Sequence, residues 1–362
     1  MIGHKFLIHF AFSLSVSLFF CQMALAQVPP GYYNGTDDLY GQALQQALHN
    51  IIKNHQPRTY SDLWGDFMST DRKSNNKVWD MYSDRPGGSP AYEFTFSADQ
   101  CGNYNGEGDC YNREHSFPAS WFNDGYPMYS DLFQIIPTDG YVNNRRSNFP
   151  FGEVGQSDWT STNGSRLGNS ATPGYNGTVF EPIDDYKGDL ARNILYMAVR
   201  YYNEDGSWPG SDMTDGAEPR TWARKLLLNW HASDPVSTKE VQRNNAVYVL
   251  QQNRNPFIDH PEFAEQIWGE NAGINNQSPT YGIALFPNPA SGQVTIVYEN
   301  NSTATMNLSL VITNITGQTV MSAEITGNPY VLNFNKSIKS GIYLVLISSG
   351  QLPVYRSILI KQ

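Results

Sequence analysis

The pattern of hydrophobic and polar positions changes several times along the chain. After Tyr40, apolar residues recur every three or four positions, which predicts an amphipathic helix that ends before Pro57. A second helix is predicted over residues 61–70. We expect His49 and His55 to be surface residues of the first helical segment, not ligands. The chain therefore begins as a helical domain.

Strands are expected next. Residues 77–82 and 92–96 alternate between apolar and polar positions, which predicts two strands with a Pro-Gly-Gly turn between them. Residues 111–116 predict a strand that a proline ends, and residues 142–147 predict the start of a short helix. The segment 152–177 is rich in Gly, Ser, Thr and Asn, so we expect a long surface loop there.

A further helix is predicted from a cap at Asp189 to Tyr202, with an apolar stripe facing the core. The composition then shifts to Asn, Gly, Gln, Ser and Pro over 270–282, as is typical of a linker. Beyond it, short alternating strands separated by turns predict a small all-β sandwich over 283–362. The expected fold class is α+β, with a mainly helical domain over 27–269.

The N-terminus has the features of a secretory signal peptide over residues 1–26. Lys5 precedes an apolar run, and Ala24-Leu25-Ala26 forms a small-x-small cleavage site. A membrane helix is the alternative, but the apolar run is short for a full span. Lipid attachment at Cys21 is disfavoured because two phenylalanines precede it.

Export gives meaning to the two remaining cysteines. Cys101 and Cys110 are nine positions apart, and outside the cytoplasm such a pair is expected to form a disulfide. Two reduced thiols are the alternative. The net charge of −10 argues against a protein that binds nucleic acid mainly by counterion release. It does not exclude a hydrolase, which needs only a local positive track and a metal ion.

The candidate chemistry lies in two stretches. Arg113-Glu114-His115 places a carboxylate beside an imidazole, and residues 143–148 supply carboxamides and two guanidinium groups. A histidine can deprotonate water, a hard cation prefers oxygen ligands, and an arginine fork suits phosphate oxygens. Alone, a Glu-His pair is more typical of an ordinary surface position at the end of a strand. Together the two stretches contain what cleavage of a phosphodiester with one divalent metal requires.

Ordered segments at 113–121, 130–132, 137–143 and 146–152 resemble the bacterial endonuclease I family. The resemblance extends over about residues 32–268. It implies a secreted or periplasmic nuclease whose mainly helical domain surrounds a ββα-metal motif, also called a His-Me finger.

The resemblance also implies roles for individual residues. His115 would be the general base, while Glu114 and Asn143 would ligate one Mg²⁺ ion whose shell water completes. Mn²⁺ and Ca²⁺ are alternative ions. Zinc is disfavoured because the sequence lacks closely spaced His or Cys pairs of the structural-zinc type.

Other positions match the family around the phosphate. Arg146 is the first choice for contacting a nonbridging oxygen, and Arg113, Arg145 and Asn148 are candidate substrate-binding residues. The chain departs from many relatives at Phe133-Gln134, where a His-His pair is usual. This departure puts substrate binding or the orientation of the site in doubt.

The C-terminal segment contains four short motifs, at residues 285–290, 317–318, 341–343 and 360–361. With these motifs it resembles the sorting domain of type IX secretion substrates. The implied partner is the type IX secretion machinery, and an accessory binding module is the alternative. The expected protein is a monomeric nuclease, secreted or on the outer-membrane surface by way of the periplasm. Its expected reaction is nonspecific, Mg²⁺-dependent hydrolysis of DNA, with RNA left open, to 5′-phosphate ends. The rival functions are a non-catalytic surface adhesin and a nuclease-like pseudoenzyme.

Overall fold

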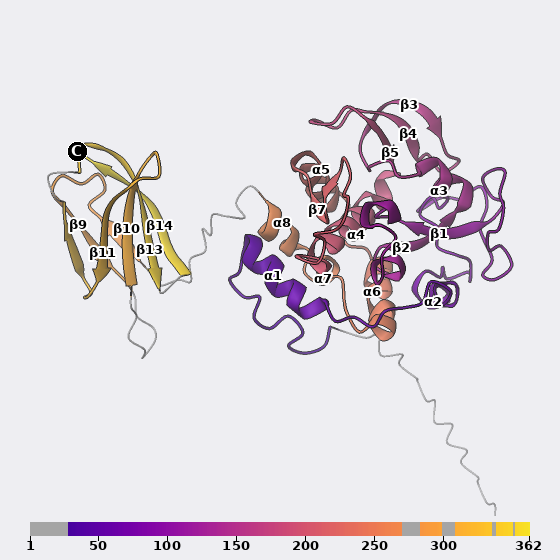
Figure 1. Ribbon diagram of the computed structural model, residues 1–362, viewed down its shortest axis with the longest axis horizontal. Helices are drawn as coiled ribbons and strands as arrows, with labels where there is room; N and C mark the ends of the chain where they lie inside the picture. The colour runs from indigo at the N-terminus through magenta and orange to yellow at the C-terminus, as the bar shows by residue number, and fades with distance from the viewer. Residues whose placement is uncertain (1–27, 270–282, 299–307, 335–337, 350–351) are drawn as a thin grey trace, which may run out of the picture.

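Two separate hydrophobic cores organise the chain. The computed structural model describes residues 28–269, 283–298, 308–334, 338–349 and 352–362 (Figure 1). One buried cluster lies within residues 33–268 and the other within 290–359. The predicted signal peptide and linker lie outside the described residues. Within the described part of the chain, no helix is both long and apolar enough to cross a bilayer.

The first core is surrounded by helices and three small antiparallel sheets, so the predicted α+β class is confirmed. The helices are α1 (Gly41–Ile52), α2 (Leu63–Thr70), α3 (Gly140–Arg146), α4 (Lys187–Arg200), α5 (Thr221–Ser233), α6 (Thr238–Gln251), α7 (Pro256–Asp259) and α8 (Glu262–Trp268), with 3₁₀ turns η1 (Ala119–Phe122), η2 (Met128–Ser130) and η3 (Asp184–Tyr186). The strands are β1 (Tyr111–His115), β2 (Ile135–Asp139), β3 (Val154–Thr160), β4 (Arg166–Ser170), β5 (Thr178–Glu181), β6 (Thr214–Asp215) and β7 (Glu218–Pro219).

Helix α4 lies at the centre of this domain and is buried along its whole length. Its predicted apolar stripe belongs to the core. The helix begins at Lys187, before the predicted cap at Asp189. Its charged residues are tolerated in the interior because they are paired: for example, Arg192 donates to the Glu240 carboxylate, a partner on α6.

Two expected strands do not form. Residues 77–82 and 92–96 pair only at isolated positions, such as the bridge between Lys77 and Thr95. The amide of Trp79 donates instead to the carbonyl of Asp71, and the amide of Tyr82 donates to the Asp80 carboxylate. These local bonds turn the chain away from a ladder.

The prediction of a long surface loop over 152–177 is wrong. Residues 154–160 and 166–170 of this segment form β3 and β4, which pair with β5 in a three-stranded sheet. Two register shifts interrupt the pairing of β3 with β4, and most of β3 is exposed. Because β3 is mostly exposed and its pairing is irregular, its sequence lacks the alternation of apolar and polar residues that identifies a half-buried strand.

The expected surface positions of His49 and His55 are also wrong, because both are buried. The Nδ1 of His49 lies within hydrogen-bond distance of the carbonyls of Val199 and Arg200. The Nδ1 of His55 accepts from Arg200 Nε at 2.8 Å. Their partners lie at the end of α4, so the pattern of α1 alone could not reveal them.

The second core lies between two antiparallel sheets, as the predicted β-sandwich requires. Their strands, in the orders β11-β10-β13-β14 and β12-β9-β8, are β8 (Ala284–Phe286), β9 (Gln293–Val297), β10 (Leu308–Asn314), β11 (Thr319–Ile325), β12 (Tyr330–Asn333), β13 (Gly341–Ser349) and β14 (Leu352–Lys361). Along β10, Leu308, Leu310 and Ile312 are buried and alternate with more accessible residues. This alternation is the signal that made the strand predictable.

Candidate active site

The site is built on β1 and β2, which pair antiparallel, and on α3, which follows β2 directly and packs against β1. Asp139 ends the second strand and caps the helix: its Oδ1 accepts from the amides of Tyr141 and Val142 at 2.8 and 2.9 Å. This N-cap satisfies two amides that the first turn cannot pair. The residues of β1 and α3 are thereby fixed in one rigid unit.

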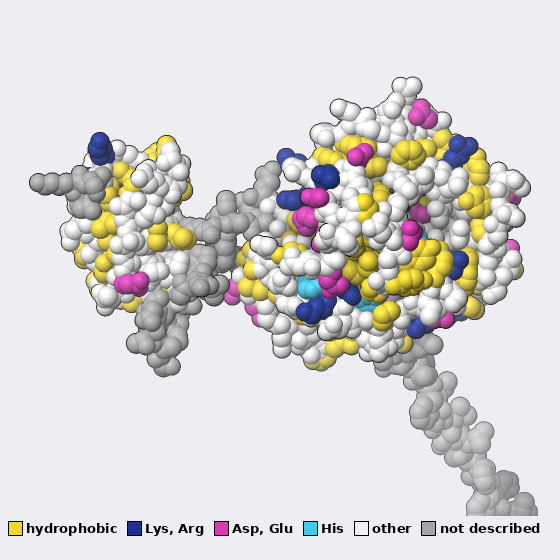
Figure 2. Space-filling view, in the orientation of Figure 1, with side chains coloured by type: hydrophobic (Ala, Val, Ile, Leu, Met, Phe, Trp, Pro, Cys, Tyr) yellow, Lys and Arg dark blue, Asp and Glu magenta, His cyan; other side chains and the backbone are white. Residues whose placement is uncertain are grey.

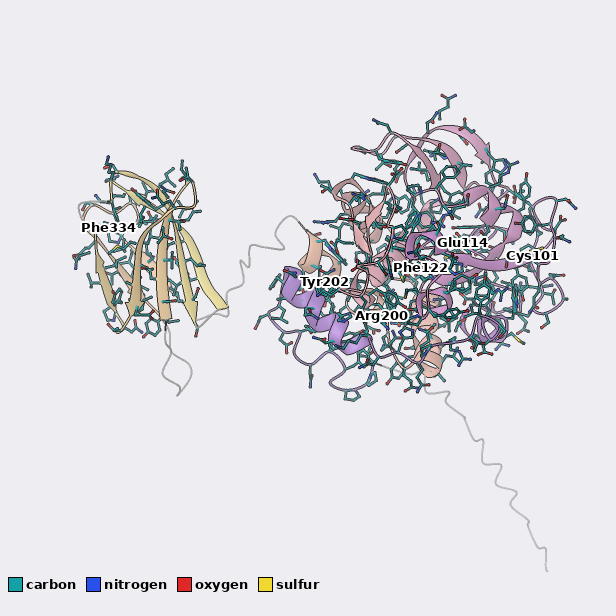
Figure 3. The ribbon with its side chains drawn as sticks, in the orientation of Figure 1. Cys101, Glu114, Phe122, Arg200, Tyr202 and Phe334 are labelled. Atoms are coloured by element: carbon teal, nitrogen blue, oxygen red, sulfur yellow. A yellow bond between two sulfur atoms is a disulfide. The ribbon has the colours of Figure 1, made fainter. Side chains whose placement is uncertain are left out.

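Glu114, labelled in Figure 3, is a buried residue of β1. The hydroxyl of Tyr82 donates to its Oε1 at 2.9 Å, and Arg146 Nη1 is 3.3 Å from the same oxygen. Burial raises the pKa of the carboxyl to about 7, although Arg146 and Tyr82 both act to lower it. Oε2 has no hydrogen bond to any described side chain or amide, so it is available to a ligand.

His115 points to the other face of the strand, because successive side chains alternate. Its ring is partly buried among Tyr60, Phe122 and Tyr129. Nε2 lies 3.2 Å from the carbonyl oxygen of Tyr129. Since a carbonyl only accepts, Nε2 carries the proton, and Nδ1 of the neutral ring presents a lone pair. Burial lowers the pKa of the imidazole to about 4.

The guanidinium of Arg146 faces the interior, where its side chain is only 1% exposed. Nη1 donates to the carbonyl of His115 at 2.8 Å, and Nη2 donates to the carbonyl of Ser116 at 2.7 Å. These bonds tie the end of β1 to α3. A side chain engaged in this way has little capacity left for a substrate phosphate.

The other predicted substrate-binding residues differ in accessibility. Arg113 Nη1 donates to the carbonyl of Tyr60 at 2.8 Å, and its guanidinium packs on the rings of Tyr60 and Trp64. Arg145 and Asn148 are exposed. Asn143, on α3, is partly exposed and its carboxamide has no hydrogen-bond partner in the described part of the chain.

The predicted disulfide between Cys101 and Cys110 is present. It packs against the first residue of α3, because a Cβ at Gly140 would lie 2.5 Å from Cys101 Sγ and 2.9 Å from the Tyr104 ring. Glycine is therefore required there for close approach. The bridge supports the helix that carries Asn143.

The departure at Phe133-Gln134 has a structural explanation. Phe133 is buried against Tyr196, with ring centroids 4.7 Å apart. Gln134 Nε2 donates to the carbonyl of Met128 at 2.8 Å, and the main-chain carbonyl of Gln134 accepts from the Ser116 hydroxyl at 2.8 Å. Gln134 therefore holds Ser116, which follows β1, and Phe133 packs against α4.

Tyr82 and the carbonyl of Tyr129 are site groups that the sequence did not reveal. Tyr82 lies in a segment that matches the family, but nothing in its spacing pairs it with Glu114. The carbonyl of Tyr129 belongs to the main chain and has no sequence signal.

The donor set fits Mg²⁺. The oxygens of Glu114 and Asn143 are of the hard type this ion prefers, and Mg²⁺ keeps several waters, so few protein ligands are needed. A bound cation would also offset the cost of burying the Glu114 carboxylate. On the face shown in Figure 2, acidic and basic side chains are interspersed and form no broad basic field.

Comparison with known proteins decides the family. Residues 40–262, more than half of the chain, match Endonuclease I. The chain belongs to the Endonuclease I family. Residues 284–361 match the secretion system C-terminal sorting domain, as predicted. The protein is therefore an enzyme of the nuclease class that is secreted or displayed at the cell surface.

Several curated proteins are similar to it. The extracellular ribonuclease of Bacillus subtilis (strain 168) is 35% identical over 248 residues, which cover 66% of this chain and 78% of that protein. The extracellular ribonuclease of Bacillus amyloliquefaciens is 36% identical over 246 residues, with the same coverage. An extracellular deoxyribonuclease of Aeromonas hydrophila is 29% identical over 171 residues, 47% of this chain and 62% of that protein.

Proposed function

We propose that the chain is a secreted, Mg²⁺-dependent, sequence-nonspecific endonuclease that hydrolyses DNA and RNA to 5′-phosphate ends and acts as a monomer. The observation that carries this proposal is the pair Glu114 and His115. One has a free carboxylate oxygen in a buried position, and the other has a free ring nitrogen on the opposite face. The likeness to both ribonucleases and deoxyribonucleases supports action on both nucleic acids.

In this mechanism, Nδ1 of His115 accepts a proton from the attacking water. The water oxygen bonds to phosphorus while the bond from phosphorus to the 3′-oxygen breaks. The Tyr129 carbonyl fixes the tautomer and the ring orientation that this step requires. The aromatic residues around the ring keep it neutral.

Glu114 and Asn143 would hold Mg²⁺ in a ββα-metal arrangement formed by β1, β2 and α3. When bound, this ion supplies positive charge that offsets the charge on the phosphate and on the leaving oxygen. Tyr82 orients Glu114 so that Oε1 is engaged and Oε2 is available.

We assign Arg146 a positioning role instead of the phosphate contact expected from the sequence. Its donors engage the carbonyls of His115 and Ser116, and its charge lies beside Glu114. Among the predicted substrate-binding residues, the exposed Arg145 and Asn148 are better placed to meet phosphates than the packed Arg113.

Cleavage of supercoiled plasmid and of single-stranded RNA, with Mg²⁺ and with excess EDTA, tests the proposal. We expect nicked and linear plasmid and shortened RNA with Mg²⁺, and loss of both activities with EDTA. Intact substrates under all metal conditions would favour the adhesin or pseudoenzyme reading. Cleavage that survives EDTA would contradict metal dependence.

A further inference from the structure

A cluster of two aromatic rings and one arginine lies on the surface beside α3. The guanidinium carbon of Arg145 is 5.0 Å from the ring centroid of Tyr141 and 5.8 Å from that of Trp159. Nε and Nη2 of Arg145 donate to the Tyr141 hydroxyl at 3.1 and 2.6 Å. Arg145 is exposed, both rings are partly exposed, and Arg145 has no ion pair with any described carboxylate. We call these three residues the platform.

The fold brings the platform together from two elements. Tyr141 and Arg145 are one turn apart on α3, so they share a face of that helix. Trp159 comes from β3, just after a register shift that follows Ser157. A bulge of this kind re-aims side chains. Gly168 on β4 allows this bulge in β3, because a Cβ at position 168 would collide with the carbonyl oxygen of Gln156.

A purely structural stack would fasten β3 to α3. Such a contact would be expected to bury its charge or to pair it with an acid, as Arg146 does with Glu114. The platform does neither, and it exposes aromatic and guanidinium surface to solvent. These are the groups on which nucleobases stack and to which phosphates bind.

We propose that Tyr141, Arg145 and Trp159 bind an unpaired nucleobase of single-stranded DNA or RNA. The inference rests on the proposed nuclease function and specifies its substrate. A base inside a duplex is already stacked on its neighbours and cannot offer a face. The platform therefore favours single strands over duplexes.

The position of the platform suits a substrate strand that crosses α3. Asn143 lies between Tyr141 and Arg145 in sequence but about half a turn away around the helix. A helix with its side chains is about 10 Å wide. A stacked nucleic-acid strand rises about 3.4 Å per nucleotide, so about three nucleotides cross the helix. The bound base would thus lie a few nucleotides from the phosphate that is cut.

Steady-state cleavage of three substrates of the same length tests the inference: a single strand, its duplex, and a single strand made of abasic residues. Each is prepared as DNA, and the first two also as RNA. Trp159→Ala should lower the ratio of kcat/KM for single strand over duplex by about 10-fold, as loss of one base stack would. On the abasic strand, wild type and variant should be equal. The effect should appear mainly in KM.

Trp222→Ala is the matched control, because Trp222 is also partly exposed and belongs to another helix, α5, where it stacks on Tyr175 with ring centroids 4.5 Å apart. This control should leave the ratio unchanged. An equal fall on all three substrates after Trp159→Ala would show that the platform only supports the fold, and no change would show that it binds no base. If wild type cut none of the substrates, the proposed function would fail instead. Thermal unfolding of both variants verifies that they are folded.

Discussion

The two faces of β1 differ sharply, although their key residues are adjacent in sequence. On one face Glu114 is nearly inaccessible and is engaged by Tyr82 and Arg146. On the other face His115 is surrounded by aromatic rings, and within the described residues its ring makes one hydrogen bond, to a main-chain carbonyl. The strand β1 thus places the carboxyl group and the imidazole of one dipeptide in different environments. This difference would allow the proposed cation site and the proposed proton acceptor to be adjacent without forming an ion pair with each other.

The same contrast occurs on α3. Arg146 is buried and bonded to the end of β1, whereas its neighbour Arg145 is exposed on the platform. Residue type alone does not distinguish them. Their burial predicts that one arginine acts on the fold and the other on the substrate.

The largest expected effect comes from removing the buried arginine. Arg146→Ala leaves the carboxylate of Glu114 without its charged partner and two carbonyls without donors. The free energy of unfolding should fall by about 3 kcal/mol. Arg145→Ala, at the exposed neighbouring position, should change it by about 0.5 kcal/mol or less. Urea denaturation of both variants measures this, and equal losses would remove the contrast between the two arginines.

A smaller effect is expected from Tyr82→Phe, which removes one hydroxyl and keeps the ring. Glu114 loses a donor that orients it, so the Mg²⁺ concentration for half-maximal cleavage should rise about 10-fold. Tyr111→Phe is the control, because Tyr111 is a buried tyrosine of β1, the strand that carries Glu114, and its hydroxyl accepts a 3.3 Å bond from the amide of Ser97 instead of donating to Glu114. If both variants behaved like wild type, Tyr82 would have no part in the metal site.

The smallest effect on catalysis is expected from deleting everything after Trp268. The two hydrophobic cores are separate, and no predicted site residue lies in the second one. Turnover should be unchanged when the shortened protein is made in a host that forms the disulfide. In the native cell it should remain in the periplasm. Nuclease activity measured in medium, envelope and periplasm checks this, and normal release would favour an accessory binding role for the β-domain.

Much of the fold was predictable where one face of an element repeats regularly. Helix α1, the buried stripe of α4 and the alternating strand β10 all carry such a period. Prediction failed for β3, where exposure and bulges remove the regular alternation of apolar and polar residues. It also failed for His49, because hydrogen bonds to residues distant in sequence determine its burial.

The site shows the same division. The sequence predicts catalytic and metal-binding roles for Glu114 and His115, and each keeps one acceptor atom without a hydrogen-bond partner among the described residues. It could not separate the environments of Arg145 and Arg146, because adjacent helix positions differ by about 100° in direction and only the packed fold shows which one faces inward. Nor could it reveal the Tyr129 carbonyl, since every residue has one.

The central claim is that His115 accepts a proton while Glu114 and Asn143 hold the metal. Initial rates of plasmid cleavage measured against Mg²⁺ concentration, for wild type, His115→Ala, Glu114→Ala and Asn143→Ala, test it most directly. We predict that His115→Ala loses at least about 100-fold in maximal rate at an unchanged half-saturating Mg²⁺ concentration. Glu114→Ala and Asn143→Ala should need more Mg²⁺ and recover part of the rate as it is raised. Identical Mg²⁺ dependence in all three variants, or a near-wild-type rate for His115→Ala, would contradict the account.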